Sequence, residues 1–371
     1  GAAILGCGFV TTFWPFFILM LAHCLLYVPT ISITNSIAFA HIDDPKKNFP
    51  IVRTGGTIGW ILAAIPFTFI LVDWESVNAM EHEGFKDWLG AALGSGLTGD
   101  ALKEATKWTY VAAGIASFVL AAFSFTLPHT PPKKVEAGSE GSLAWLEAAK
   151  LLRYPFIAVL FLVTFADSFV HNCYFNWTGR FLGASVEVGG VGIAGNWIMP
   201  VMTVGQVAEI LTMLILGVVL KKLGWRWTMV VGVLGHAARF AAYAFFPEHQ
   251  ALIIAIQVLH GVCYAFFFAT VYIFVDAYFP KDARSSAQGL FNLMILGIGA
   301  LAANSICPYL FDEVFTEGAV TNFHGLFMVP LICASVAAVV LAICFHPPEV
   351  SVTQALDEEA SDNMDEQVRS S

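Results

Sequence analysis

The sequence predicts an all-α polytopic membrane protein, and three observations support this fold class. Hydrophobic residues make up 57% of the 371 residues and charged residues only 12%, whereas a soluble domain carries about a quarter charged residues. The mean hydropathy is +0.72. Apolar runs near the roughly 20 residues that a membrane span needs recur along the chain, and they lack the strict alternation of barrel strands. We therefore expect several membrane-spanning helices.

Nine apolar runs are long enough to be complete spans. A shorter run over residues 1–10 precedes them, and we interpret it as the end of a broken helix. The chain opens inside this run at Gly1, without a Met or a signal peptide, so we expect leading segments to be missing. The nine predicted spans cover residues 12–41, 50–72, 108–127, 155–182, 192–220, 227–246, 251–279, 287–311 and 323–346.

A polar stretch divides the predicted spans into two groups. The segment PHTPPKKVEAGSEGS begins at position 128, and its composition is typical of a linker, which we place at residues 129–154. Six spans follow it within residues 155–346, and three spans plus the short run precede it within residues 1–128. A six-plus-six transporter would place its central loop here, so we expect its first two to three helices to be missing. Residues 347–371 form an acidic tail that we expect to be disordered.

Charged residues lie mainly outside the predicted spans. Most of the 18 Lys and Arg residues fall in alternate loops, which predicts that every span crosses the membrane and that the basic side is cytoplasmic. The tail would then be cytoplasmic as well. The net charge of −10 comes from acidic loops and the tail, and no basic stripe indicates a nucleic-acid partner.

A carboxyl group near the middle of the 192–220 span is the strongest candidate for chemistry. Charged residues at this depth are costly, so those present usually face a cavity or a partner. Glu209 follows Gln206 by three residues, which places both on one helix face. A buried carboxyl group can exchange a proton near neutral pH, so we expect Glu209 to couple proton and solute movement. The alternative is a structural contact to another helix, for example to Arg239.

Arg53, Thr57 and Trp60 form a second candidate cluster, in the segment PIVRTGGTIGW. Steps of four and three residues align them on one helix face. Arg53 and Thr57 offer hydrogen-bond donors, and Trp60 offers a ring on which a base or sugar could stack. The alternative reading makes Arg53 an interfacial cation and Trp60 a packing residue.

Other polar residues within spans offer less specific signals. Asp167 and His171 are four residues apart and could share a proton, although His171 could equally be a core histidine. Arg239 needs a partner within its apolar span. Asp276, at the end of its span, is expected to be an inter-helix latch.

Enzyme motifs are missing from the sequence. We find no nucleophile elbow, no zinc-protease motif and no phosphate-binding glycine loop. The seven cysteines form no metal-ligand spacing. The sequence therefore predicts neither an enzyme nor a metal site, and no cofactor beyond a coupling proton.

Five segments occur in order from about Tyr27 to Phe291: YVPTISITNSIAF, FPIVRTGGTIGW, TLPHTPP, GQVAEIL and FVDAYFPKDARSSAQGLF. In these segments the chain resembles the bacterial nucleoside:proton symporters of the major facilitator superfamily, and compatible spans continue to His346. The resemblance implies twelve helices in two halves, alternating access and a central nucleoside site.

The resemblance also implies ligand contacts on two helices. Arg53, Thr57 and Trp60 match contact positions of the family's fifth helix, where this chain has Trp for the usual Phe. Gln206 and Glu209 match contacts of the eighth helix.

Matches on the seventh and tenth helices are less regular. His171 and Asn172 are the nearest candidates for the family's Gln and Asn in the seventh. His260 and Tyr264 match two ligand-facing aromatic positions of the tenth, but the acidic residue expected next is Ala265. Glu209 and Asp167 remain as acids that could compensate for the missing carboxyl group.

Taken together, these features predict a secondary active transporter that imports nucleosides by proton symport, with Glu209 as the proton-coupling group. We expect an integral protein of the lipid bilayer, in a bacterial inner membrane; the sequence gives no indication of oligomeric state. Two alternatives stay open. One is a facilitator or symporter of another polar solute such as a sugar. The other is a membrane receptor that binds nucleoside without transporting it, an option that Ala265 keeps open.

Overall fold

The computed structural model describes residues 1–97, 99–130, 150–193, 195–279, 284–318 and 320–347. Its chain divides into two compact units. Unit 1 comprises Gly1–Ala40, Ile58–Lys134 and Ala194–Pro200. Unit 2 comprises His41–Thr57, Val135–Ile193 and Val201–Ser371. Most of the predicted linker and all but the first residue of the predicted tail lie outside the described residues.

The predicted spans are confirmed as helices. Among the described residues, eight helices are long and apolar enough to cross a membrane, so the chain is an integral membrane protein. Four lie at least partly in unit 1: α2 (Phe13–His41), α3 (Pro45–Ile70), α6 (Gly99–Ser124) and α9 (Gly195–Phe245), whose first residues belong to it. The others are α8 (Pro155–Gly183), the run Gln250–Tyr278, the run Ser286–Val314 and α15 (Phe323–Cys344).

The helix α9 contains two of the predicted spans. A span of 51 residues would be far longer than a bilayer needs. Its backbone leaves helical geometry at Gly224, where φ is 70° and ψ is 178°. Only glycine adopts this region without strain, so Gly224 separates the two spans predicted over 192–220 and 227–246.

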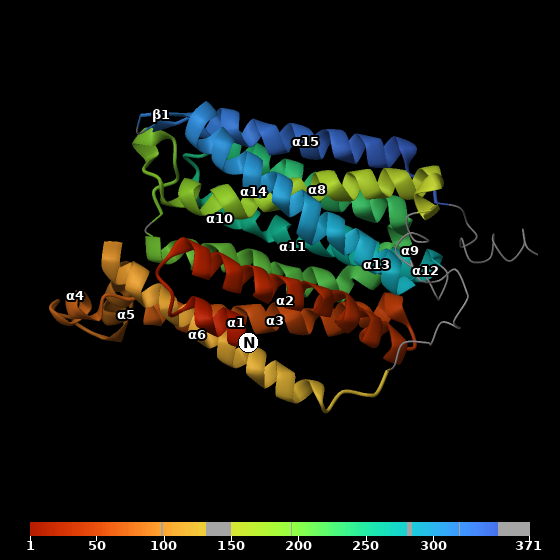
Figure 1. Cartoon of the computed structure of the whole chain (residues 1–371). Helices are drawn as coiled ribbons and strands as arrows, with labels where there is room; N and C mark the ends of the chain where they lie inside the picture. The colour runs from red at the N-terminus through yellow and green to blue at the C-terminus, as the bar shows by residue number, and fades with distance from the viewer. Residues whose placement is uncertain (98, 131–149, 194, 280–283, 319, 348–371) are drawn as a thin grey trace, which may run out of the picture. The chain divides into compact units, whose positions relative to one another are not determined.

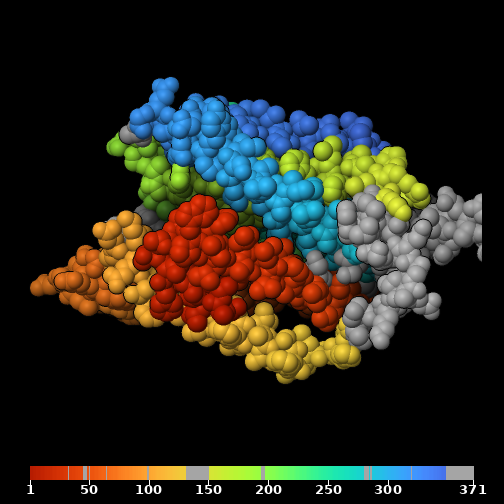
Figure 2. Space-filling view, viewed as in Figure 1, coloured from red at the N-terminus to blue at the C-terminus, as the bar shows by residue number. Residues whose placement is uncertain are grey.

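Unit 2 is built around α8. Pro155 occupies the first turn of this helix, where its missing N–H costs nothing. The helix packs along α14 (Gly299–Tyr309) and α15, and Figure 1 shows the three running side by side. In Figure 2 the blue side chains of α14 and α15 lie directly against the yellow-green side chains of α8.

Two of the spans in unit 2 contain wider π-helical turns. The run Gln250–Tyr278 consists of α10, η4, α11, η5 and α12, and the next consists of α13, η6, α14 and η7. The π-helical turns are η5 (Tyr264–Ala269), η6 (Leu293–Ile298) and η7 (Leu310–Val314). Such turns are rare and frequently occur at functional sites. The remaining bounds are α10 Gln250–Ala255, η4 Ile256–Val258, α11 Leu259–Cys263, α12 Thr270–Tyr278 and α13 Arg284–Asn292.

Unit 1 packs the short helix α1 (Ala2–Cys7) against α6. At Gly114 of α6, an added Cβ would lie 2.7 Å from Leu5 Cβ, so the small residue allows the close approach. The acidic stretch after α3 is not simply a loop, because it contains α4 (Trp74–Asn78) and α5 (Phe85–Gly94).

Short elements outside the spans are fixed by local hydrogen bonds. The Asp73 carboxylate caps α4 by accepting from the Ser76 backbone N–H at 3.1 Å, and the hydrogen bonds from Ser76 hold the pKa of Asp73 below its ordinary value. Asn322 caps α15 in the same way. The remaining elements are η2 (Leu151–Arg153), η3 (Val186–Val188) and a hairpin of β1 (Thr316–Glu317) and β2 (Val320–Thr321).

Candidate functional site

A close helix contact in unit 2 positions the candidate residues. The backbones of α9 and α11 approach each other at Gly205 and Gly261. An added Cβ on Gly261 would lie 2.3 Å from the backbone nitrogen of Glu209, and one on Gly205 would lie 2.8 Å from His260 Cβ. Small residues allow such contacts between membrane helices. The contact holds Glu209 of α9 and His260 of α11 in neighbouring positions.

The first group of polar residues, which we call the Glu209 cluster, comprises Arg53, Thr57, Glu209 and Tyr264. All four belong to unit 2. The Thr57 hydroxyl donates to Glu209 Oε1 at 2.6 Å. Arg53 donates to the Tyr264 hydroxyl, and its guanidinium carbon lies 5.4 Å from the centre of the Tyr264 ring. The cluster thus joins a carboxyl group, a cation, a hydroxyl and an aromatic ring from three helices.

Two other predicted contacts lie on the same helices as the cluster. Gln206 lies one turn before Glu209 on α9, and both side chains are buried. Trp60 lies on α3, three residues beyond Thr57, and its side chain is 39% exposed. Trp60 falls in unit 1, and its role as a stacking surface stays a prediction.

The predicted residues of α8 and α11 form an aromatic stack. The His171 and His260 rings stack with centroids 5.2 Å apart, and the His171 ring lies 6.3 Å from that of Tyr264. This places His171 and His260 beside the Glu209 cluster. Asn172 donates to the Ser168 backbone carbonyl at 2.9 Å, so its amide is engaged on its own helix.

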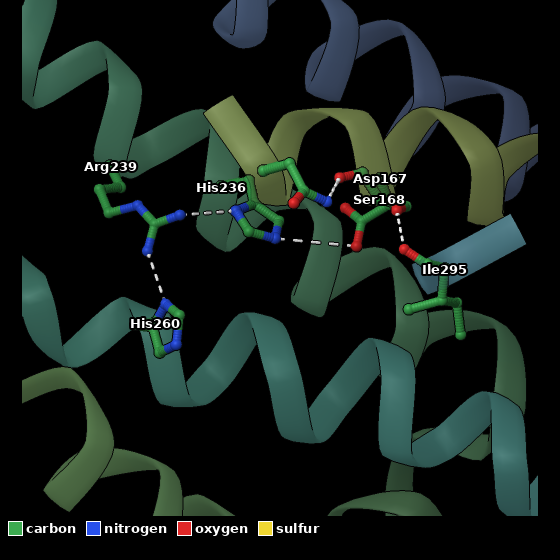
Figure 3. A network of polar contacts seen from close by, with 7 residues as sticks. Asp167, Ser168, His236, Arg239, His260 and Ile295 are labelled. Atoms are coloured by element: carbon green, nitrogen blue, oxygen red, sulfur yellow. Dashed lines mark hydrogen bonds and ion pairs between the residues drawn. The ribbon is translucent and has the colours of Figure 1, made fainter. Parts of the chain in front are cut away.

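A second group of polar residues, which we call the Arg239 network, comprises Asp167, His236, Arg239 and His260. Figure 3 shows Arg239 between two imidazoles, with Nη2 2.8 Å from His236 Nδ1 and Nη1 3.2 Å from His260 Nδ1. His236 Nε2 lies 3.7 Å from Asp167 Oδ2. The network connects α8, α9 and α11, and all four side chains are buried.

Two sequence-based interpretations of these residues are wrong. Arg239 was a possible partner of Glu209, but it contacts His236 and His260, while Glu209 accepts from Thr57. Asp167 does not pair with His171. Their spacing left this pairing open, with a core histidine as the other possibility, and Asp167 is instead directed toward His236 on α9.

His236 was not predicted from the sequence, although a signal was present. His236 precedes Arg239 by three residues in an apolar span, which places both on one helix face. The latch predicted at Asp276 is confirmed. Asp276 Oδ1 on α12 lies 3.2 Å from Arg284 Nη1 on α13.

Two of the π-helical turns, η5 and η6, lie next to these groups. Ala265 is fully buried in η5, so the position where the family resemblance leads us to expect an acid carries only a methyl group. In η6, the Ile295 carbonyl accepts from the Ser168 hydroxyl at 2.5 Å (Figure 3). This bond ties α8 to η6 immediately beside Asp167.

Comparison with known proteins identifies the family. The family model described as "Nucleoside H+ symporter" matches residues 1–93 and 88–350. The Escherichia coli (strain K12) protein named "Putative nucleoside transporter YegT" is 30% identical over 92% of this chain and 75% of its own length. The "Nucleoside permease NupG" of the same organism is 24% identical over 86% of this chain and 71% of its own length.

Solved structures give the same fold. A crystal structure of the nucleoside transporter NupG superposes with a TM-score of 0.58 at 21% identity, covering 94% of this chain and 81% of that one. The outward conformation of FucP, a major facilitator superfamily transporter, superposes with a TM-score of 0.60 at 12% identity, covering 92% and 78%. The chain therefore has the major facilitator fold and belongs to the nucleoside H+ symporter family, and it is a membrane transporter rather than an enzyme.

Proposed function

We propose that this protein imports nucleosides together with protons, and that the Glu209 cluster forms part of the nucleoside site. Family membership supports the transport class. The observation that carries the site is the joining of Glu209, Thr57, Arg53 and Tyr264 by direct contacts across three helices. A nucleoside presents hydroxyl groups, ring nitrogens and a flat base, and these four side chains offer complementary chemistry.

Each group of the cluster has a distinct role in this proposal. Arg53 donates to acceptors on the base or sugar, because a guanidinium carries only donors. The Tyr264 ring provides a stacking face. Gln206, His171, His260 and Asn172 supply further contacts around it.

Glu209 links nucleoside binding to the proton. As a carboxylate it only accepts hydrogen bonds, and it holds the Thr57 hydroxyl in this way. When it is protonated, one of its oxygens becomes a donor. The set of hydrogen bonds available to a bound nucleoside therefore changes with the proton, which is the property that a symporter needs.

The same proposal covers the location of the protein. We place it in the inner membrane of a bacterium, because its named relatives are Escherichia coli proteins. The acidic tail would lie in the cytoplasm, since the basic loops favour that side.

The test is uptake of radiolabelled uridine and adenosine into vesicles containing the protein, with and without an inward proton gradient. We expect the gradient to stimulate uptake and unlabelled nucleosides, but not sugars, to compete. Glu209→Gln should weaken the stimulation. Competition by sugars alone would contradict the proposal, as would a Glu209→Gln variant with the full response to the gradient. Nucleoside binding without uptake would indicate a receptor.

A further inference from the structure

Asp167 is a fully buried acid whose oxygens lack hydrogen bonds. Its side chain is 0% exposed, and neither carboxylate oxygen has a hydrogen-bond partner among the described residues. A buried carboxylate normally requires hydrogen bonds or a paired charge. The nearest partner is His236 Nε2 at 3.7 Å, which is longer than a hydrogen bond. This carboxyl group therefore keeps lone pairs free to bind a proton.

The neighbouring imidazoles cannot take that proton without breaking existing bonds. A guanidinium only donates hydrogen bonds, so Arg239 must be the donor to Nδ1 of both His236 and His260. Each imidazole is then neutral, with its hydrogen on Nε2. The Nε2–H of His236 is directed at Asp167. The free basic positions of the network are thus the two Asp167 oxygens.

The net charge of the network depends on the protonation state of Asp167. Arg239 is fully buried and permanently positive. Its guanidinium carbon lies 4.0 Å from the centre of the Tyr174 ring, which stabilises the cation only in part. An ionised Asp167, acting through His236, balances the charge of Arg239. A protonated Asp167 leaves one net positive charge buried, so its charge state changes how firmly Arg239 is held.

We propose that Asp167 binds a second coupling proton, and that His236 and Arg239 transmit its charge state to His260 beside the nucleoside cluster. The inference rests on the proposed symport function. In the transport cycle, Asp167 forms an O–H bond when a proton enters from one side of the membrane. That bond breaks when the proton leaves on the other side.

His260 is where the two groups of residues meet. It accepts a hydrogen bond from Arg239 and stacks on His171. An Arg239 that is held less firmly would release His260 Nδ1 and free it for a ligand. Proton binding at Asp167 thereby alters the nucleoside site through two hydrogen bonds.

Other titratable groups also face the network. They come from four of the helices packed around it: His171 and Tyr174 on α8, Tyr243 on α9, Cys263 on α11 and Cys333 on α15. Among these, His171 is the one that titrates near neutral pH in its free form. A His171→Gln variant therefore tests whether His171, rather than Asp167, carries the proton. We expect its uptake to be slower than that of the wild type, because His171 lies beside the Glu209 cluster. Its accumulation at equilibrium should still reach about hundredfold, because that ratio depends only on the number of coupled protons.

The experiment measures nucleoside accumulation at equilibrium in vesicles whose membrane potential is clamped to zero. Each coupled proton then supports about tenfold accumulation for one unit of pH gradient. Two coupled protons, on Glu209 and Asp167, predict about hundredfold accumulation of uridine in the wild type, and about tenfold for Asp167→Asn. His236→Gln, which removes the connection to Arg239, should also fall to about tenfold.

Controls separate a lost proton from a lost fold. Exchange of labelled for unlabelled uridine requires no net proton movement, so both variants should retain it. Thr164→Ser changes a buried, non-titrating residue one turn before Asp167 and keeps its hydroxyl, and it should accumulate uridine as the wild type does.

The outcomes distinguish the two proposals. Wild-type accumulation of only about tenfold would overturn the second proton but leave symport intact. The second proton would also be overturned if Asp167→Asn still accumulated uridine about hundredfold. It would be overturned as well if accumulation by His171→Gln fell to about tenfold while exchange persisted, because His171 would then carry the proton. No gradient-driven accumulation by the wild type would contradict the symport function itself. If Asp167→Asn and His236→Gln both lose exchange, the wild-type accumulation decides whether a second proton is coupled.

Discussion

The Glu209 cluster and the Arg239 network lie in the same unit but are built differently. In the cluster, every charged group has a direct partner: Glu209 accepts from Thr57, and Arg53 donates to Tyr264. In the network, Arg239 is held by two neutral imidazoles, and Asp167 is reached only through His236. The cluster also includes a half-buried cation, whereas the network is buried throughout.

This difference indicates that the two groups have different functions. Contacts between side chains on different helices, such as Thr57 with Glu209, can be exchanged for contacts with a solute. The four side chains of the network are at most 2% exposed, and a proton is small enough to bind the Asp167 carboxyl group without displacing a side chain. We therefore assign nucleoside binding to the cluster and part of the proton coupling to the network.

The largest effect is expected where the two groups share a helix contact. A Cβ on Gly261 would lie 2.3 Å from Glu209 N and 2.4 Å from the Ala208 carbonyl carbon, so Gly261→Ala must push α11 away from α9. A displacement of this kind can cost on the order of a hundredfold in rate. We expect uridine uptake and exchange to fall together by that order, measured in vesicles at matched protein content.

Gly55→Ala is the matched control for this substitution. An added Cβ on Gly55 meets no atom within 4 Å among the described residues, so uptake should stay near the wild-type level. Equal losses in Gly55→Ala and Gly261→Ala would show that the close approach of α9 and α11 does not position the site.

The second prediction separates the network from the cluster by stability. Asp167→Ala removes the acid that balances Arg239 and should lower the free energy of unfolding by about 3–5 kcal/mol. The double variant Asp167→Ala with Arg239→Met should recover much of this loss, because no unpaired charge remains. Unfolding of the purified protein in detergent measures both values. Additive losses in the double variant would show that the two charges are not coupled.

The third prediction is the smallest and affects only the cluster. Thr57→Val leaves a buried Glu209 oxygen without its donor, which should cost about 1–3 kcal/mol of stability. Thr57→Ser keeps the hydroxyl and should cost less. The same unfolding measurement compares them. A Thr57→Val protein as stable as Thr57→Ser would show that the hydrogen bond at 2.6 Å contributes little.

Much of the fold could be predicted from the sequence because a membrane span has a strong compositional signal. The apolar runs over 12–41 and 155–182 match α2 and α8 within one residue at each end. Helices extend further where polar residues continue the turn, as in α6, which begins at Gly99 rather than near Trp108. Because the polar residues at a helix end are not part of the apolar run, the run predicts a helix that is too short.

The site was predicted less completely because its partners are distant in the sequence. Spacing placed Arg53 and Thr57 on one face, but it could not identify Tyr264, 211 positions away from Arg53, as the partner. Spacing also allowed His171 as a partner of Asp167, while packing of α8 against α9 selects His236. Local periodicity describes one helix, and contacts between helices depend on how glycines such as Gly261 let them approach.

Proton entry driven by nucleoside addition tests the account most directly. Uridine is added outside lightly buffered vesicles without a preset gradient, and a trapped dye reports internal pH. We predict acidification in step with uptake for the wild type, and uridine entry without acidification for the double variant Glu209→Gln with Asp167→Asn. Acidification by the double variant at the wild-type rate per uridine would contradict the assignment of the coupling protons to these two carboxyl groups.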